Sequence, residues 1–277
     1  MSPALRTQAF AGHLRIEAAR RPDGRTALAR QSVRAPFHLS KPYWDGSVLQ
    51  MRVINATAGI LAGDRLELAA RVGPGAALLV ITPSATRAYM MRRGAAGCRQ
   101  AFSVAAGGWL ECAPEPLFPH HDTDYEQATR LDVDAGGGAY FVESLAPGRT
   151  GKGESWAWRR MRLTLEVALD GMLLLRERFD GSGAELGALS AFYGMREAWF
   201  ATVVAVLPPP AEDEGIGSGV RALERPGLWI GATRLGPGCW VVRVAAPGAL
   251  SLRDTLAALR DVFSSALPRL RSNLRQV

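Results

Sequence analysis

Several carboxylate side chains stand where packing alone does not explain an acid. Asp64 follows an apolar run as part of a Gly-Asp pair, Glu143 interrupts an apolar segment, and Glu154 closes a glycine-framed segment. Carboxylate oxygens and water suit a hard or borderline divalent cation that is held loosely. Because passage of an ion needs loose binding, a buried, water-lined set of these acids predicts conduction or handover of a metal ion and not storage. The alternative interpretation is that each acid lies on the surface.

A second candidate for metal chemistry is a polar segment with paired histidines. His120, His121 and Asp122 belong to the one cluster of metal-ligand residue types in the sequence. Adjacent side chains on a strand point to opposite faces, so one ion would use only one histidine unless the segment is an irregular loop. Pro116 and Pro119 favour such a loop. The segment is therefore interpreted either as a solvated polar loop or as a weak divalent-metal site.

The common signatures of catalysis and nucleotide binding are missing from the sequence. It has no GxSxG, HExxH or Walker motif, and segment 148–154 lacks the Gly-Lys-[Ser/Thr] ending of a phosphate loop. The 3 cysteines are scattered and form no CxxC pair, which disfavours a zinc knuckle or a disulfide framework. A hydrolase that uses Asp64 and Glu154 as an acid/base pair stays open, and it would require strongly split pKa values.

The charge of the chain favours an acidic protein partner. The formal net charge is +7 and the pI is about 9.9, with the arginines spread along the chain and no long basic run. This pattern argues against nucleic-acid binding. No window reaches the roughly 18 consecutive apolar residues of a membrane span, and the N-terminus has no apolar signal-peptide core. The sequence therefore predicts a cytoplasmic protein without a nucleic-acid or membrane partner.

The elements that must position these residues are mostly short strands. Apolar or alternating runs are separated by Gly and Pro roughly every ten residues, a spacing typical of a many-stranded β architecture. Segment 161–169 alternates and precedes Asp170-Gly171, which is a strong hairpin signal. Nothing in the middle of the chain resembles the alternating strands and long helices of a parallel α/β sheet.

Helical periodicity appears late in the chain. We expect a short helix over 185–193 and an amphipathic helix over 251–263, capped by Ser251 and ended by Pro268. Segment 208–219, rich in Pro, Gly and acids, predicts a mobile surface loop, because strand-like runs resume after it. The expectation is one mainly β domain spanning 1–277.

A series of short motifs extends over nearly the whole chain. They are Arg34-Ala-Pro-Phe-His38, Ala58-Gly-Ile-Leu-Ala-Gly-Asp64, Thr82-Pro-Ser-Ala-Thr-Arg-Ala-Tyr89, Leu110-Glu-Cys-Ala-Pro-Glu-Pro116, Val142-Glu-Ser-Leu-Ala-Pro-Gly-Arg149 followed by Gly153-Glu154, and Trp240-Val-Val-Arg-Val-Ala. In order and spacing this series resembles the UreD/UreH-type urease accessory proteins. The chain departs from the family pattern at Ala58, where glycine is usual, at Arg87, where lysine is common, and at Glu143, where aspartate is frequent. His120 and His121 are not part of the pattern.

The resemblance implies an elongated, β-helix-like stack of mostly antiparallel strands with a few helices, and a scaffold instead of an enzyme. It also implies binding to UreF, which recruits the GTPase UreG, docking on apo-urease, and transient passage of nickel with no tightly bound cofactor. Carried over residue by residue, the nickel path is expected to involve Asp64, Ser84, Thr86, Glu143, Arg149 and Glu154. The motif residues expected to shape the backbone are Gly59, Gly63, Gly148, Arg149 and Gly153.

Two other functions stay open beside the scaffold interpretation. One is a β-sandwich or jelly-roll protein that binds a carbohydrate or a small anion. It would need an aromatic-lined site, and the 7 tryptophans are dispersed along the sequence. The other is the acid/base hydrolase, which would turn over substrate as an isolated chain. Copurification with UreF would separate the scaffold from both.

Overall fold

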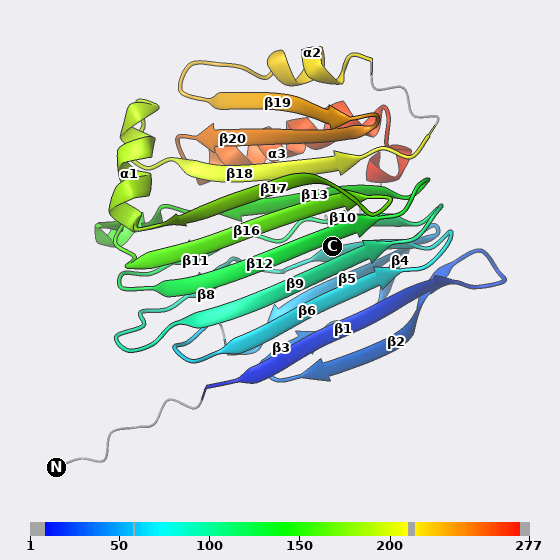
Figure 1. The fold of residues 1–277 in the computed structure, drawn as a ribbon, viewed down its shortest axis with the longest axis horizontal. Helices are drawn as coiled ribbons and strands as arrows, with labels where there is room; N and C mark the ends of the chain where they lie inside the picture. Colours follow the sequence, from blue (N-terminus) through cyan, green and yellow to red (C-terminus); the bar gives the residue numbers. More distant parts are fainter. Residues whose placement is uncertain (1–8, 58, 210–213, 272–277) are drawn as a thin grey trace.

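The chain folds into a β-solenoid-like stack of two large sheets, as a computed structural model of residues 9–57, 59–209 and 214–271 shows. The sheets lie face to face, with α1 at one end of the stack and α2 beyond the last strands (Figure 1). The prediction of a mainly β, β-helix-like fold with a few helices, including one near the C-terminus, is confirmed.

The first sheet is seven-stranded, in the order β17-β16-β12-β9-β6-β1-β2. Its strands are β1 Ala11–Arg20, β2 Thr26–Arg34, β6 Arg65–Val72, β9 Ala96–Val104, β12 Asp124–Val133, β16 Arg160–Leu169 and β17 Met172–Gly181.

The second sheet is eleven-stranded, with the main order β19-β20-β18-β13-β10-β7-β5-β3 and with β4, β8 and β11 paired beside it. Its strands are β3 Phe37–Leu39, β4 Tyr43–Asp45, β5 Val48–Asn55, β7 Ala77–Ile81, β8 Thr86–Ala88, β10 Trp109–Cys112, β11 Leu117–Pro119, β13 Gly138–Leu145, β18 Trp199–Val206, β19 Trp229–Gly236 and β20 Cys239–Ala246. A small hairpin joins β14 Gly148–Arg149 to β15 Glu154–Ser155 around the 3-10 turn η1 Thr150–Lys152.

Successive strands in the middle of the chain alternate between the two sheets. β6, β9, β12 and β16 lie in the first sheet, and β5, β7, β10 and β13 lie in the second, so neighbours within each sheet run parallel. The expected antiparallel pairing holds for β1–β2, β16–β17 and the ladders that join β13, β18, β20 and β19. The Asp170-Gly171 hairpin is confirmed as the β16–β17 turn.

The expectation of mostly antiparallel strands is wrong for the central stack because its turns look like hairpin turns in sequence. The turns 73–76, 105–108 and 134–137 each carry the chain from the first sheet to the second instead of back along the same sheet. They also stack on one another, since the Gly107 amide donates to the Gly136 carbonyl at 3.0 Å. We call this end of the stack the turn end.

Two apolar layers explain the sequence pattern of the strands. Alternate residues of both sheets, among them Ile16, Leu78, Phe102 and Phe141, fill the space between the sheets. The other face of the second sheet is covered by α3 Ala249–Ser264 and packs as a second cluster. Strands such as β10 are therefore buried on both faces, which is why they appear in the sequence as continuous apolar runs.

The helices match the predicted positions, with two corrections. α1 spans Gly183–Phe192 and starts with a capping box between Ser182 and Glu185. α3 starts earlier than predicted, so Gly248 and not Ser251 is its N-cap residue, and the helix ends before the 3-10 turn η2 Pro268–Arg271.

The segment predicted as a mobile loop, 208–219, is partly helical. α2 spans Ile216–Arg221, and Ile216 is buried in the cluster between α3 and the second sheet. Residues 210–213 lie outside the described residues. The sequence analysis did not predict this helix because the segment is rich in glycine, which disfavours helix formation. Among the helices that the structure describes, none combines the length and apolar character needed to span a bilayer.

Candidate functional site

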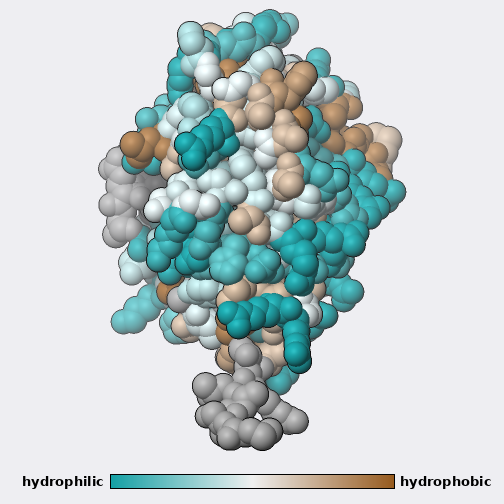
Figure 2. Space-filling model, turned by 90° about the vertical axis from the view of Figure 1, so that its left-hand side faces the viewer, coloured by the Kyte–Doolittle hydropathy of each residue, from teal (hydrophilic) through white to brown (hydrophobic). Residues whose placement is uncertain are grey.

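The residues singled out in the sequence lie at the end of the stack opposite the turn end. Here the strands of the second sheet stop, and the connections 56–64, 82–95, 113–123 and 146–159 lead to the first sheet. We call this the loop end; α1 lies beside it, on the left of Figure 1. Figure 2 looks onto this end, where hydrophilic side chains surround a paler central area.

A cavity of about 690 Å³ lies between the two sheets and reaches the loop end. Of the predicted path residues, Ser84, Thr86 and Glu143 line it, and the motif residue Gly59 lines it too. Asp64 and Glu154 are not among its lining residues. The structure therefore brings together one of the three predicted acids and the two hydroxyl residues.

Glu143, on β13, is the predicted acid that lines the cavity, and Glu115 and Glu177 line it as well. Glu143 Oε1 accepts hydrogen bonds from Thr129 Oγ1 at 2.6 Å and Gln127 Nε2 at 3.0 Å, while Oε2 has no donor among the described residues. Burial raises the pKa of Glu143 to about 7, against the two hydrogen bonds, which lower it. Near neutral pH the carboxyl group is thus divided between its charged and neutral forms, and its free oxygen is available to a cation.

Asp64 is fully buried and holds the connection before β6. Its Oδ1 accepts from the Phe10 amide and its Oδ2 from the Leu61 amide, both at 2.9 Å. Gly63 enables this turn, because its φ of +90° is a conformation that favours glycine. With both carboxylate oxygens bound to backbone amides, Asp64 organises the loop end from within.

Arg149 and Glu154 face each other across the β14–β15 hairpin. Arg149 donates from Nε at 2.7 Å and from Nη2 at 2.5 Å, and this ion pair holds the pKa of Glu154 below its usual range. Gly148 and Gly153 have positive φ values, and Gly153 ends the turn η1. The Gly-Arg…Gly-Glu signature is therefore a tight hairpin closed by its own ion pair.

The paired histidines separate in the structure. His120 is buried and meets the Tyr89 ring edge-on at 4.8 Å, whereas His121 Nδ1 lies 3.1 Å from Asp122 Oδ2. Within the part of the chain that the structure describes, no group of three or more His, Cys, Asp or Glu side chains is placed to hold a metal ion. His120, His121 and Asp122 are therefore not gathered into a three-ligand cluster, and the weak metal site stays a prediction.

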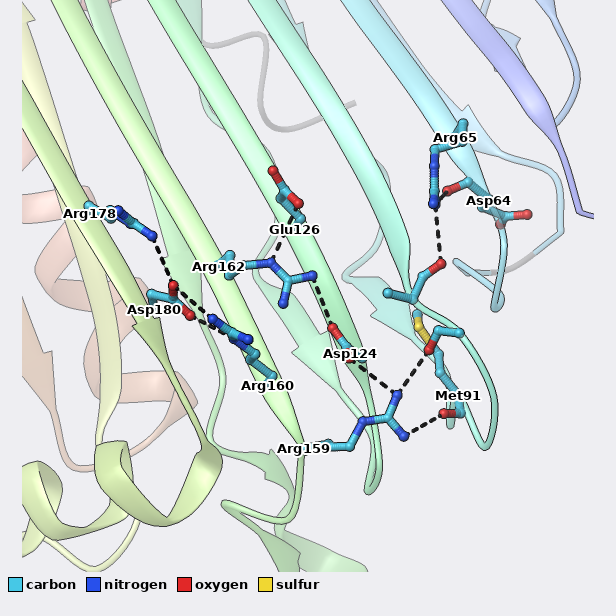
Figure 3. A network of polar contacts seen from close by, with 12 residues as sticks. Asp64, Arg65, Met91, Asp124, Glu126, Arg159, Arg160, Arg162, Arg178 and Asp180 are labelled. Carbon is cyan, nitrogen blue, oxygen red and sulfur yellow. Dashed lines mark hydrogen bonds and ion pairs between the residues drawn. The ribbon is translucent and has the colours of Figure 1, made fainter.

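A polar network on the outside of the first sheet fixes the loop end from another side (Figure 3). Arg159 donates to the carbonyls of Met91 at 3.1 Å and Gly94 at 2.9 Å, and it pairs with Asp124 at 3.3 Å. Arg162 pairs with the other oxygen of Asp124 at 3.1 Å. The network ties connection 82–95 to the strands β12 and β16.

Comparison with known proteins agrees with this architecture. The family model described as UreD urease accessory protein matches residues 11–276. The chain belongs to the UreD family.

Curated relatives support the assignment over most of the chain. A urease accessory protein UreD from Opitutus terrae is 52% identical over 97% of this chain and 99% of its own length. Proteins of the same name from Cereibacter sphaeroides and Alkalilimnicola ehrlichii are 31% and 30% identical, over 82% and 88% of this chain and 82% and 83% of their own. The resemblance found in the sequence is confirmed.

The two polar partners of Glu143 in this UreD-family chain escaped the sequence analysis. Gln127 and Thr129 hold Glu143 from β12, where every second side chain faces inward. The alternation of β12 was the signal that could have found them, because Leu131 and Val133 fix which face is buried.

The structure also bears on the fold and the residue pair that the two alternative functions require. The β-sandwich prediction is wrong, because consecutive strands alternate between sheets as in a solenoid. Asp64 binds backbone amides and Glu154 binds Arg149, so the described contacts do not join them as an acid/base pair.

Proposed function

We propose that this protein acts in urease maturation and passes nickel ions through the cavity between its two sheets. Support for the maturation role comes from the family match and from relatives named urease accessory proteins. The observation that supports the nickel step is Glu143, whose Oε2 has no donor among the described residues and which faces a cavity of about 690 Å³.

The groups around Glu143 suit transient binding, although Glu115 and Glu177 also line the cavity. The neighbours that hold Glu143, Gln127 and Thr129, are neutral, and the other predicted lining residues, Ser84 and Thr86, offer hydroxyl oxygens. Such ligands replace part of the water shell of a cation, but they bind it less tightly than several histidines or thiolates would. Because the pKa of Glu143 is about 7, cation and proton compete for the carboxylate, and binding releases protons.

In this proposal the protein is a cytoplasmic scaffold that binds UreF, recruits UreG through UreF, and docks on apo-urease. An exposed aromatic cluster supports a protein interface. Phe192 at the end of α1 is 80% exposed and Trp229 on β19 is 53% exposed, and both contact the Tyr193 ring. Exposed apolar side chains that cluster in this way are typical of protein–protein contacts.

Copurification tests the scaffold part of the proposal. The chain is coexpressed with UreF and analysed by size-exclusion chromatography, where a stable heteromeric complex is expected. A chain that elutes alone in the presence of UreF contradicts the scaffold role.

Substitution at the cavity tests the nickel part. Glu143→Gln keeps the shape and removes the charge, so nickel content and activity of urease matured with this variant should fall at least severalfold. Glu126→Gln, on the exposed face of β12, removes the same charge outside the cavity and should leave both unchanged. Pull-down of UreF monitors the complex in both variants. Full nickel loading with Glu143→Gln contradicts the proposed path.

A further inference from the structure

A second hollow, of about 380 Å³, lies at the loop end beside the main cavity. Its lining residues come from the connections 82–95 and 113–123 and from β14, and they are Ala85, Arg87, Tyr89, Phe118, His120 and Arg149. Ala85 and Arg87 line the main cavity as well, so the two spaces adjoin. Two of the residues that line the hollow are arginines, and none is acidic.

His120 is a buried polar side chain without a protein partner in this hollow. It is only 8% exposed, yet neither ring nitrogen has a hydrogen-bond partner among the described residues. Its ring is held by the edge-on contact with Tyr89. Its ring nitrogens are not among the fully enclosed side-chain atoms that lack a partner, so they are open to water or to a ligand in the hollow.

The arginines also keep donors free. Arg87 forms no ion pair or side-chain hydrogen bond within the described part of the chain, and it lies on β8 opposite Phe118. Arg149 uses Nε and Nη2 for Glu154, which leaves Nη1 without a described acceptor. Burial, Arg149 and Arg87 lower the pKa of His120, which keeps the imidazole neutral and able both to donate and to accept.

The charges decide which kind of ligand fits. Arg87 and Arg149 each carry a positive charge, Glu154 offsets one of them, and a neutral His120 adds none. A divalent cation would meet an excess of positive charge here. A small monoanion would instead find free guanidinium donors and an imidazole that completes its hydrogen bonds.

We propose that the hollow between Arg87, His120 and Arg149 is a binding site for a small oxyanion of the bicarbonate or dihydrogen-phosphate type. Such an ion has charged oxygens for the two guanidinium groups and a hydroxyl that donates to the free nitrogen of the imidazole. Glu143, on which the proposed nickel step rests, is not among its lining residues.

Histidine NMR of the full chain tests the site directly. The ring signals of His120 are assigned by comparison with His120→Gln and followed during titration with inorganic phosphate or bicarbonate, with chloride at matched ionic strength as the reference. A saturable shift with either oxyanion and none with chloride is expected. Because a charge-assisted hydrogen bond is lost, Arg87→Gln should weaken the binding roughly tenfold or more.

Arg221→Gln is the matched control, because it removes one exposed arginine charge from α2 and leaves the hollow intact. Binding at wild-type strength in this variant supports the site. Equal weakening in Arg221→Gln and Arg87→Gln would mean general charge screening and would overturn the proposal. So would the absence of a saturable shift in the wild-type chain, or a His120 response to Ni²⁺ alone with none to the oxyanions.

Discussion

Individual glycines at the two ends of the stack serve different purposes. At the turn end, short turns repeat from one coil to the next, and the Cβ of an alanine at Gly136 would have no neighbour within 4 Å. At the loop end, glycines sit against other parts of the chain, as at Gly59, where a Cβ would come within 2.5 Å of the Tyr89 ring. Gly136 therefore supplies backbone conformation, and Gly59 supplies space; the contrast belongs to these positions, since Gly108 and Gly137 at the turn end are also close to backbone oxygens.

The two ends also differ in the chemistry that they carry. The turn end closes each coil with local hydrogen bonds and carries none of the predicted site residues. The loop end holds the buried Asp64, the Arg149–Glu154 hairpin and both hollows. Long connections can hold buried acids, ion pairs and hollows, whereas a short repeating turn has too few residues to form them.

Replacement of one glycine at each end measures this contrast. Gly148→Ala should lower the free energy of unfolding by about 4 kcal/mol, because its φ is +113° and the new Cβ would lie 2.5 Å from the Glu154 carbonyl oxygen. Gly136→Ala, with a φ of +81° and open space, should cost about 1 kcal/mol. Urea unfolding of both variants gives the values. Equal costs would remove the proposed difference between the ends.

The buried carboxylate of the loop end should come next in effect. Asp64→Ala leaves the amides of Phe10 and Leu61 without their acceptors, at an expected cost of about 3 kcal/mol. Asp64→Asn keeps one carbonyl acceptor and should cost less. Asp134→Ala, at an exposed position of a turn-end turn, should stay within about 0.5 kcal/mol of the wild type. If denaturant unfolding gave equal losses of stability for Asp134→Ala and Asp64→Ala, the structural role assigned to Asp64 would be wrong.

Glu143 should make the stability of the loop end depend on pH. Its pKa rises from 4.5 to about 7 on folding, so the folded chain binds this proton more tightly than the unfolded chain. The resulting stabilisation is complete below pH 4.5 and is lost as pH rises to about 7. Glu143→Gln should lack this loss, which we expect to be roughly 2 kcal/mol because water in the cavity weakens the effect of burial.

Urea melts of wild type, Glu143→Gln and Glu126→Gln across this pH range measure the effect. The stability of the wild type should fall relative to that of Glu143→Gln as pH rises, whereas Glu126→Gln should follow the wild type. Parallel curves for all three proteins would show that Glu143 titrates as an ordinary solvated acid.

Much of the loop end was predictable because its chemistry is local. The spacing of Gly148, Arg149, Gly153 and Glu154 marks a tight segment, and the ion pair joins residues five apart. The pairing of β12 with its neighbours was not predictable in direction, because a glycine turn that crosses between sheets has the same composition as one that closes a hairpin. The burial of Asp64 likewise follows from contact with Phe10, 54 residues away.

The separation of the three acids shows the same limit. The sequence grouped Asp64, Glu143 and Glu154 because each stands beside glycine or within an apolar run. Only Glu143 lies on an inward position of a strand that borders the cavity, and its partners Gln127 and Thr129 come from the opposite sheet. Which acid meets the cavity depends on the register between sheets, and that register is set by contacts distant in sequence.

The smallest expected effect concerns the outer network that fastens the loop end (Figure 3). Arg159 bonds to the Met91 carbonyl, 68 residues away, so Arg159→Ala should free connection 82–95 while it lowers the free energy of unfolding by only about 1 kcal/mol. Arg176→Ala, which removes an exposed arginine paired with Glu166 on the same sheet, should cost less than about 0.5 kcal/mol. Hydrogen exchange at Met91–Gly94 separates the two, because only the loss of Arg159 removes bonds to that backbone. If both variants left exchange there unchanged, the loop end would be held by its buried groups alone, with Asp64 and the Arg149–Glu154 hairpin as its fixed points.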